Sequence, residues 1–143
     1  MIMNSQEMLT SVLHTVQMGQ SGIKSVRDQA VQVGLKQELQ NQLQQYDNME
    51  THARQIAQQR GWEMKDISRG ITKMSDLMAK ARLIGGERDS KIAGMLIQGN
   101  TRGMILGMKH LRQGRHSDPD VLALTQMLVA QEKQSIENSK KYL

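Results

Sequence analysis

Residues 35–62 read LKQELQNQLQQYDNMETHARQIAQQRGW and carry an unbroken helical pattern. Apolar side chains recur every three or four positions, which is the spacing of one face of an α-helix. The inward residues of this pattern are Leu39, Leu43, Tyr46, Ala53, Ile56 and Ala57. Gly61 follows directly, and glycine easily adopts the left-handed conformation that ends a helix. The stretch therefore predicts a long helix over residues 35–60.

Four further helices follow from the same periodicity and from capping residues, over residues 5–32, 66–82, 89–113 and 118–141. Ser5 and Asp66 are plausible caps, and Asp118 followed by Pro119 is a typical helix start. Gly34 is expected in a tight turn between the first two helices. The short third helix is expected to turn an apolar stripe inward, formed by Ile67, Ile71, Met74, Leu77, Met78 and Ala81.

The length of 143 residues predicts a single domain, residues 1–143. Four long helices, joined pairwise by tight turns, form two antiparallel hairpins. The 28 residues from Gly61 to Arg88 connect the hairpins and contain the short helix. The predicted fold is therefore all-α, a ferritin-like four-helix bundle with a short extra helix in the long crossover. The alternative is an up-and-down bundle of five helices.

The composition excludes several classes of site. The chain has no cysteine, so disulfides and thiolate metal sites are excluded. No apolar stretch approaches the ~20 residues of a membrane span, and residues 1–8 do not resemble a signal peptide. We therefore expect a cytoplasmic protein. No phosphate-binding loop or nucleophile triad stands out, so no enzymatic activity is predicted.

Glu50 and Glu132 fall on the inward faces of their helices at about 100° per residue. In a di-iron bundle, two helices each supply a glutamate followed three residues later by a histidine. Here the corresponding positions are Ala53 and Ser135. Since two carboxylates cannot hold two irons, we predict no di-iron centre and no cofactor.

The two glutamates instead define a candidate buried polar site. Gln20 is the inward residue at similar height on the first long helix, and Gly103 or Gly99 takes this place on the fourth helix. An unpaired buried carboxylate is costly. We therefore expect Glu50 and Glu132 to pair with Arg102 or a neighbouring lysine, or a rotated helix to bring them to water.

Gly99, Gly103 and Gly107 recur every four residues and share one helix face. Glycine within a helix costs about 1 kcal/mol relative to alanine, so this helix-packing face indicates close approach of another backbone. The partner is either another helix of the same bundle or a second copy of the chain in a homodimer.

The four histidines are expected toward one end of the bundle, but their phases argue against a common metal or pH-sensitive site. We expect His14 and His52 to point away from the apolar stripes, His110 to point inward, and His116 to lie in a turn. Residues 60–116 carry most of the Lys and Arg and few acids, within a net charge of +5. This basic segment is either a solvated surface or a nucleic-acid footprint.

One family resemblance rests on Leu35-Lys36-Gln37-Glu38-Leu39, on Leu43, Tyr46 and Met49, and on Gln59-Arg60-Gly61-Trp62. These residues resemble the spore coat protein F-like group of ferritin-like bundles, in which a similar helix ends in Lys/Arg-Gly-Trp. The resemblance implies a small helical protein of Gram-positive bacteria without established catalysis, and a spore-associated location.

The predicted function is therefore a non-catalytic bundle that acts through protein association, as a homodimer, in a structural or spore-coat-like role. Two alternatives stay open. One is an atypical metal site that uses Glu50, Glu132 and His110. The other is a nucleic-acid-binding bundle that uses the basic segment.

Overall fold

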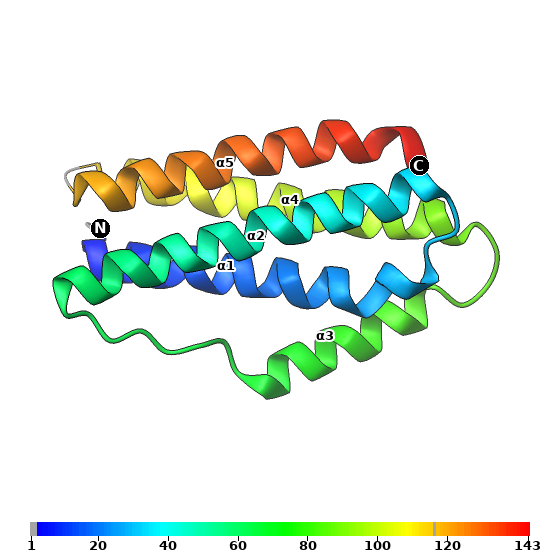
Figure 1. Ribbon diagram of the computed structural model, residues 1–143, viewed down its shortest axis with the longest axis horizontal. Coiled ribbons are helices and arrows are strands. Elements are labelled where there is room, and N and C mark those ends of the chain that lie inside the picture. The colour runs from blue at the N-terminus through cyan, green and yellow to red at the C-terminus, as the bar shows by residue number, and fades with distance from the viewer. Residues whose placement is uncertain (1–2, 116) are drawn as a thin grey trace.

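The computed structural model describes residues 3–115 and 117–143, which contain five α-helices, two short 3-10 helices and no strand (Figure 1). The α-helices are α1 (Ser5–Val26), α2 (Val33–Arg60), α3 (Arg69–Arg82), α4 (Arg88–Gln113) and α5 (Pro119–Ser139). The 3-10 helices are η1 (Arg27–Gln29) and η2 (Lys140–Tyr142). The prediction of an all-α chain is confirmed.

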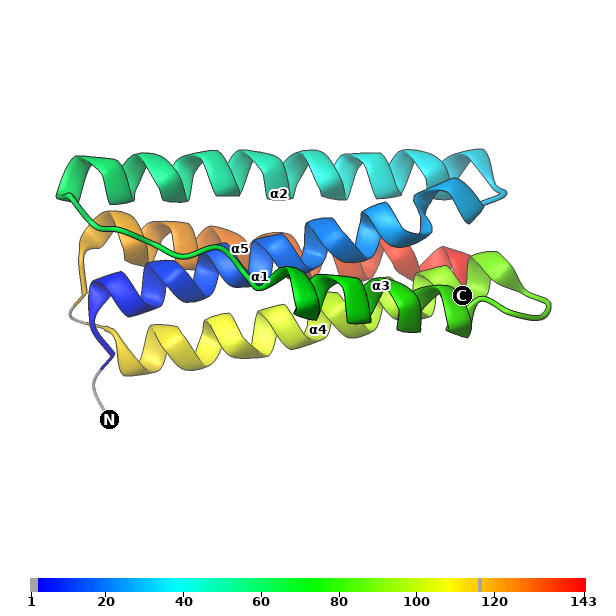
Figure 2. The same cartoon turned by 90° about the horizontal axis from the view of Figure 1, so that it is seen from below.

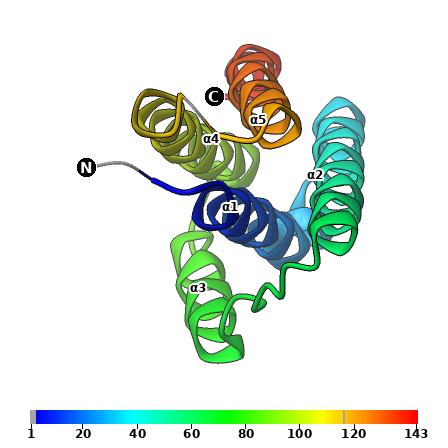
Figure 3. The same cartoon turned by 90° about the vertical axis from the view of Figure 1, so that its left-hand side faces the viewer.

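Four long helices form the bundle, and α3 lies outside it. The chain reverses between α1 and α2 and again between α4 and α5, so each pair is antiparallel (Figure 1). Helices α2 and α5 also pack against each other. The chain then returns along the bundle through the segment that contains α3 (Figure 2). Figure 3 shows α3 beside α1, on the outer side of the bundle.

The core lies between the four long helices. The inward stripe predicted for α2 is confirmed, because each of its six residues is at most 5 % exposed. Large side chains that are almost fully buried come from all four helices, namely Met8, Leu9, Leu13, Leu35, Leu39, Ile92, Leu124 and Leu128. Burial of such a side chain contributes about 1.5–3 kcal/mol, so this shared core holds the bundle together.

Two predicted helix ends are confirmed. Gly61 adopts a left-handed conformation with φ of 68°, and its N–H bonds back to the last turn of α2. Asp118 caps α5, because its side chain accepts a hydrogen bond from the N–H of Asp120, and Pro119 occupies the first helical position. The end of α4 at Gly114 also agrees with the predicted range.

The predicted caps of α1 and α3 are wrong. Asn4 caps α1, since its side chain accepts a 2.8 Å hydrogen bond from the N–H of Glu7. The hydroxyl of Ser5 instead accepts from the N–H of Asp118 at 2.8 Å, tying α1 to the start of α5. Asp66 precedes α3 without capping it, because its carboxylate is bound to Arg54 and Gln17. Both side chains form hydrogen bonds with residues far away in the sequence and therefore do not cap their own helices.

The first interhelical turn also differs from the prediction. Helix α1 ends at Val26 and continues only as the 3-10 turn η1. Gly34 lies within the first turn of α2 rather than in a tight turn. A side chain at this position would collide with the hydroxyl of Tyr142, so the glycine allows the C-terminal segment to approach α2.

The predicted inward stripe of α3 is mostly exposed. Ile71, Met74, Leu77 and Met78 are 53 %, 67 %, 70 % and 52 % exposed, whereas Ala79 is buried. Helix α3 packs mainly on α1, so only the face around Ala79 and Leu83 finds a neighbour. Ile67 is half-buried. The predicted inward side chain of Ala81 lies outside the described set.

None of the described helices combines the length and the apolar character needed to cross a lipid bilayer.

Candidate functional site

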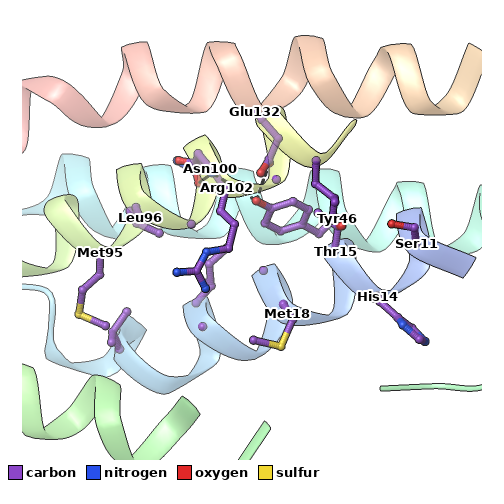
Figure 4. Close-up of a pocket in the computed structure, with 18 of the residues that line it drawn as sticks. Ser11, His14, Thr15, Met18, Tyr46, Met95, Leu96, Asn100, Arg102 and Glu132 are labelled. Carbon is purple, nitrogen blue, oxygen red and sulfur yellow. Dashed lines mark hydrogen bonds between the residues drawn. The ribbon is translucent and has the colours of Figure 1, made fainter. Parts of the chain in front are cut away.

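A chain of three buried polar side chains crosses the middle of the bundle (Figure 4). The hydroxyl of Tyr46 on α2 donates a 2.6 Å hydrogen bond to Oε1 of Glu132 on α5. The same hydroxyl oxygen accepts a 3.2 Å hydrogen bond from Nδ2 of Asn100 on α4. Glu132, Asn100 and Tyr46 are only 1 %, 2 % and 4 % exposed. The hydroxyl group of Tyr46 therefore joins α2 to α5 through the carboxyl group of Glu132 and to α4 through the amide of Asn100.

Burial changes the acidity of both titratable members of this chain. Desolvation raises the pKa of Glu132 to about 7, although the hydrogen bonds from Tyr46 and Asn100 act in the opposite direction. Burial and the nearby negative charge of Glu132 raise the pKa of Tyr46 well above its usual value. Near neutral pH, Glu132 is therefore close to the midpoint between its protonated and ionised forms, whereas Tyr46 stays protonated.

Asn100 has one unsatisfied atom. Its Nδ2 group also reaches Oε1 of Gln42 at 3.4 Å, and Gln42 in turn donates to Glu38 at 2.7 Å. The carbonyl oxygen Oδ1 of Asn100, however, is buried and has no hydrogen-bond partner. Such atoms are uncommon because an unsatisfied buried acceptor costs about 1–3 kcal/mol. An external hydrogen-bond donor would remove this cost.

Glu50 lies in a different network from Glu132. Oε1 of Glu50 accepts a 3.0 Å hydrogen bond from Gln20, whose amide also donates to Asp47. Arg54 forms a 2.8 Å ion pair with Oε2 of Glu50. Burial alone would raise the pKa of Glu50, but the hydrogen bonds from Gln20 and Arg54 lower it. The structure thus brings Gln20 and Glu50 together, apart from Glu132.

The predicted ion pair with Arg102 or a lysine is wrong. Glu50 pairs with Arg54, one turn further along α2, and its side chain is 26 % exposed at the edge of the bundle. Arg102 is exposed and takes part in none of the ion pairs of the described residues. The buried partner of Glu132 is Tyr46, which the sequence analysis assigned only to the apolar stripe. A phenol on a core stripe needs a hydrogen-bond partner, and this requirement was the available signal.

The three glycines of α4 have two different environments. A Cβ atom at Gly103 would collide with Oε2 of Glu132, and one at Gly107 would lie 2.7 Å from Val129. These two glycines allow close packing with α5 within the bundle, the first of the two predicted readings. A Cβ atom at Gly99 would have no heavy atom within 4 Å, because this position faces an open groove.

This groove runs between α1 and α4 and has a volume of about 590 Å³. Tyr46 and Glu132 lie at its floor, and Arg102 lines it (Figure 4). Gly22 of α1 and Gly99 of α4 both line the groove, and a Cβ atom at either position would meet no heavy atom within 4 Å. The groove was not predicted from the sequence, although glycines on two helices were the signal for it.

The histidines form no common site. His110 is buried as predicted, and burial lowers its pKa. His14 lies on the groove wall, where its ring nitrogen Nε2 is 2.8 Å from the carbonyl oxygen of Lys65. His116 lies outside the described residues. Among the described residues, no group of three or more histidine and carboxylate side chains is arranged to hold a metal ion.

The site therefore consists of an open groove with apolar walls and a buried carboxyl group at its floor. This arrangement can hold a ligand, because the apolar surface and the buried carboxyl group offer both hydrophobic and polar contacts. No family model, curated protein or solved structure matches the chain, so its own geometry carries the functional argument.

Proposed function

We propose that this protein is a non-catalytic helical bundle that works by association with a second copy of itself. The observation that carries the proposal is the apolar face of α3, formed by Ile71, Met74, Leu77 and Met78. Each of these side chains is more than half exposed. Contiguous exposed apolar side chains of this size are typical of interaction surfaces.

The exposed face of α3 is distinct from its polar flank. Thr72, Lys73 and Asp76 line a hollow together with Gln17 and Gln20 of α1. At about 100° per residue, Ile71, Met74 and Met78 lie on the opposite flank of α3 and on its outer side. The helix therefore has a polar flank against the bundle and an apolar surface that the described residues leave exposed.

A second copy is the partner that fits this surface best. A helix of 14 residues is about 21 Å long, so two copies of α3 can pair along their whole length around a two-fold axis. Such isologous pairing covers both apolar faces at once. Helix α3 carries four basic residues and one acid, so the apolar contact must outweigh charge repulsion between the two copies.

The expected dimer is weak. Full burial of one large apolar side chain contributes about 1.5–3 kcal/mol, and eight half-exposed ones from two copies contribute roughly 6–12 kcal/mol on the same scale. Association costs about 4–15 kcal/mol in lost freedom. The net free energy is then at best about −8 kcal/mol, so a dissociation constant of about micromolar or weaker follows.

The structural setting of the proposal is a ferritin-like bundle with a spore-coat-like role. Two antiparallel pairs, α1 with α2 and α4 with α5, joined by a long crossover, support the ferritin-like topology. The resemblance of residues 35–62 to spore coat protein F-like proteins supports a structural role built on self-association.

Sedimentation velocity across the micromolar range tests the proposal. We expect a reversible monomer–dimer equilibrium that Met78→Glu abolishes. Met127→Glu on α5 is the matched control, because Met127 and Met78 are both 52 % exposed and the substitution is identical. A monomer at all concentrations would refute self-association. Equal loss of the dimer in both variants would refute the α3 surface.

A further inference from the structure

The groove between α1 and α4 has the dimensions of a ligand site. Its volume of about 590 Å³ falls within the ~300–1,000 Å³ of small-molecule pockets. Gly22 and Gly99 contribute to its openness, since a Cβ at either position would have no heavy atom within 4 Å. The groove faces solvent along one side and ends at the buried side chains of Tyr46 and Glu132.

The walls of this groove suit an aliphatic chain. Most of their exposed surface is apolar and includes Met18, Ile23, Ile92, Met95, Leu96 and Leu106, while Thr10, Ser11 and Thr15 add hydroxyl groups. Methionine side chains are flexible and polarizable, so Met18 and Met95 can adjust to an aliphatic chain. Figure 4 shows these two methionines on either side of Arg102.

The floor of the groove presents hydrogen-bond acceptors. Oδ1 of Asn100 is buried and has no hydrogen-bond partner, and the residue as a whole is only 2 % exposed. Oε1 of Glu132 is occupied by Tyr46, whereas Oε2 lies against Gly103, which itself lines the groove. When Glu132 is ionised, a ligand that reaches these oxygens is therefore held by donating hydrogen bonds to them.

We propose that the groove between α1 and α4 binds an aliphatic primary amine, with its ammonium group on Glu132 and Asn100 and its hydrocarbon chain along the apolar walls. An ammonium group has several N–H donors and no acceptor, which matches two acceptors at one end of an apolar channel. The charge of the ligand neutralises the buried carboxylate, and its N–H groups satisfy Oδ1 of Asn100. This site lies apart from the α3 surface, so it goes beyond the proposed dimer.

Other charged groups also line the groove, and one of them could favour a ligand of the opposite charge. Glu7 and His14 from α1 and Arg102 from α4 are all on its walls. Arg102 would favour an anionic head group, so a carboxylate with the same hydrocarbon chain is the discriminating competitor. An alcohol of equal length measures the apolar contribution alone.

The probes are octylamine, octanoate and octan-1-ol, titrated into protein labelled with ¹³C at the methionine methyl groups. We expect octylamine to shift the Met18 and Met95 signals saturably, while Met127 on the far helix stays unchanged. Octylamine should bind at least about tenfold more tightly than octan-1-ol, because a desolvated ammonium–carboxylate contact is strong. Octanoate should bind no better than the alcohol.

Two variants separate the floor from the walls. Glu132→Gln removes the charge and keeps the shape, so the preference for octylamine over octan-1-ol should disappear while the alcohol still binds. Gly99→Leu fills the groove and should abolish binding of all three probes. Gly94→Leu is its control, because Gly94 lies on the same helix outside the groove lining and a Cβ there meets only Leu143 at 4.0 Å.

The pH dependence gives a third readout. Because the pKa of Glu132 is raised to about 7, octylamine binding should strengthen by roughly tenfold or more between pH 5.5 and pH 8 as the carboxylate ionises. Glu132→Gln should remove this dependence even though Glu7, His14 and Arg102 stay in place. Equal or tighter binding of octanoate, no saturable shift of Met18 and Met95, or an unchanged preference in Glu132→Gln would each overturn the proposal.

Discussion

The hydroxyl of Tyr46 donates a 2.6 Å hydrogen bond to Oε1 of Glu132, and so joins α2 to α5 across 86 positions of sequence. Both residues are buried, with Tyr46 4 % exposed and Glu132 1 % exposed. A buried carboxyl with one hydrogen-bond donor is in a balance between its charged and neutral forms. This balance makes the centre of the bundle sensitive to pH.

Glu132→Gln should stabilise the protein at alkaline pH and have little effect at acidic pH. The folded-state pKa of Glu132 is raised from 4.5 to about 7, so the folded state binds the proton more tightly than the unfolded state. This contribution to stability is fully present below about pH 4.5 and is lost as pH rises to about 7, a total of about 3 kcal/mol. The glutamine variant lacks this loss. Urea unfolding of both proteins at about pH 5 and about pH 8 measures it.

The difference between the two proteins is the informative quantity, because His110 titrates with the opposite sign. Burial lowers the pKa of His110, so its contribution is present above its unfolded pKa and is lost as pH falls. The contribution of His110 is the same in wild type and in Glu132→Gln, so it cancels when their free energies of unfolding are subtracted. A constant difference between wild type and variant across this pH range would contradict the assignment of the raised pKa to Glu132.

Tyr46→Phe should destabilise the bundle and raise the pKa of Glu132 further. The substitution leaves Oε1 of Glu132 without its donor and removes the hydroxyl oxygen that accepts from Asn100. The expected cost is about 1–3 kcal/mol. Carboxyl ¹³C NMR titration reports the pKa, and chemical denaturation reports the stability. Tyr142→Phe is the control, since the Tyr142 hydroxyl lies against Gly34, away from Glu132. An unaltered Glu132 titration in Tyr46→Phe would show that the hydrogen bond does not control this carboxyl.

Alanine at Gly99 and at Gly103 should have opposite effects. A Cβ at Gly99 enters open space, so the higher helix propensity of alanine should stabilise the protein by up to about 1 kcal/mol. A Cβ at Gly103 collides with Glu132, and overpacking of this kind costs about 1–3 kcal/mol. Thermal and urea unfolding measure both. Equal effects of the two substitutions would show that Gly99 and Gly103 do not differ in their surroundings.

Asp118 should stabilise the junction of α2 and α5 in two separable ways. Its side chain caps α5, and its carboxylate forms hydrogen bonds of 2.6 and 3.1 Å with Arg60 at the end of α2. Asp118→Ala should cost about 1–2 kcal/mol through loss of the cap, plus the contact with Arg60. Asp118→Asn retains a good cap and loses only the charge, so it should cost less.

The pH dependence of Asp118 follows from the same contact. The hydrogen bond from Arg60 lowers the pKa of Asp118. The stabilisation is therefore present above its unfolded pKa and disappears as the pH falls through the folded value. Urea unfolding at neutral and acidic pH tests this. The wild-type advantage over Asp118→Asn should shrink on acidification, and an advantage that grew would contradict the ion pair.

Local patterns predicted the parts of the fold that depend on neighbouring residues in sequence. The period of the apolar residues placed the buried stripe of α2, including Leu39 and Ala53. Gly61 and Asp118 ended and began helices as expected, because their conformations depend on local backbone geometry. By contrast, Ser5 and Asp66 are used in long-range contacts, which local rules do not register.

The candidate site was predicted only in part. Sequence phase correctly placed Glu132 and His110 inside the bundle, since their helices are surrounded by neighbours. It placed Glu50 inward as well. Glu50 lies at the edge of the apolar stripe of α2, where a small rotation of the helix decides whether a side chain is buried or partly exposed. Arg54, one turn away, then holds Glu50 at the rim.

The sequence by itself determined an all-α chain, the long helices and the inward position of Glu132, because periodicity and capping act over a few residues. The tertiary structure decided which side chains face each other across helices. It paired Glu132 with Tyr46, left Oδ1 of Asn100 without a partner, and opened a groove beside Gly99. It also left the apolar face of α3 without a neighbour, because the rotation and packing partners of a helix depend on the shapes of all its neighbours.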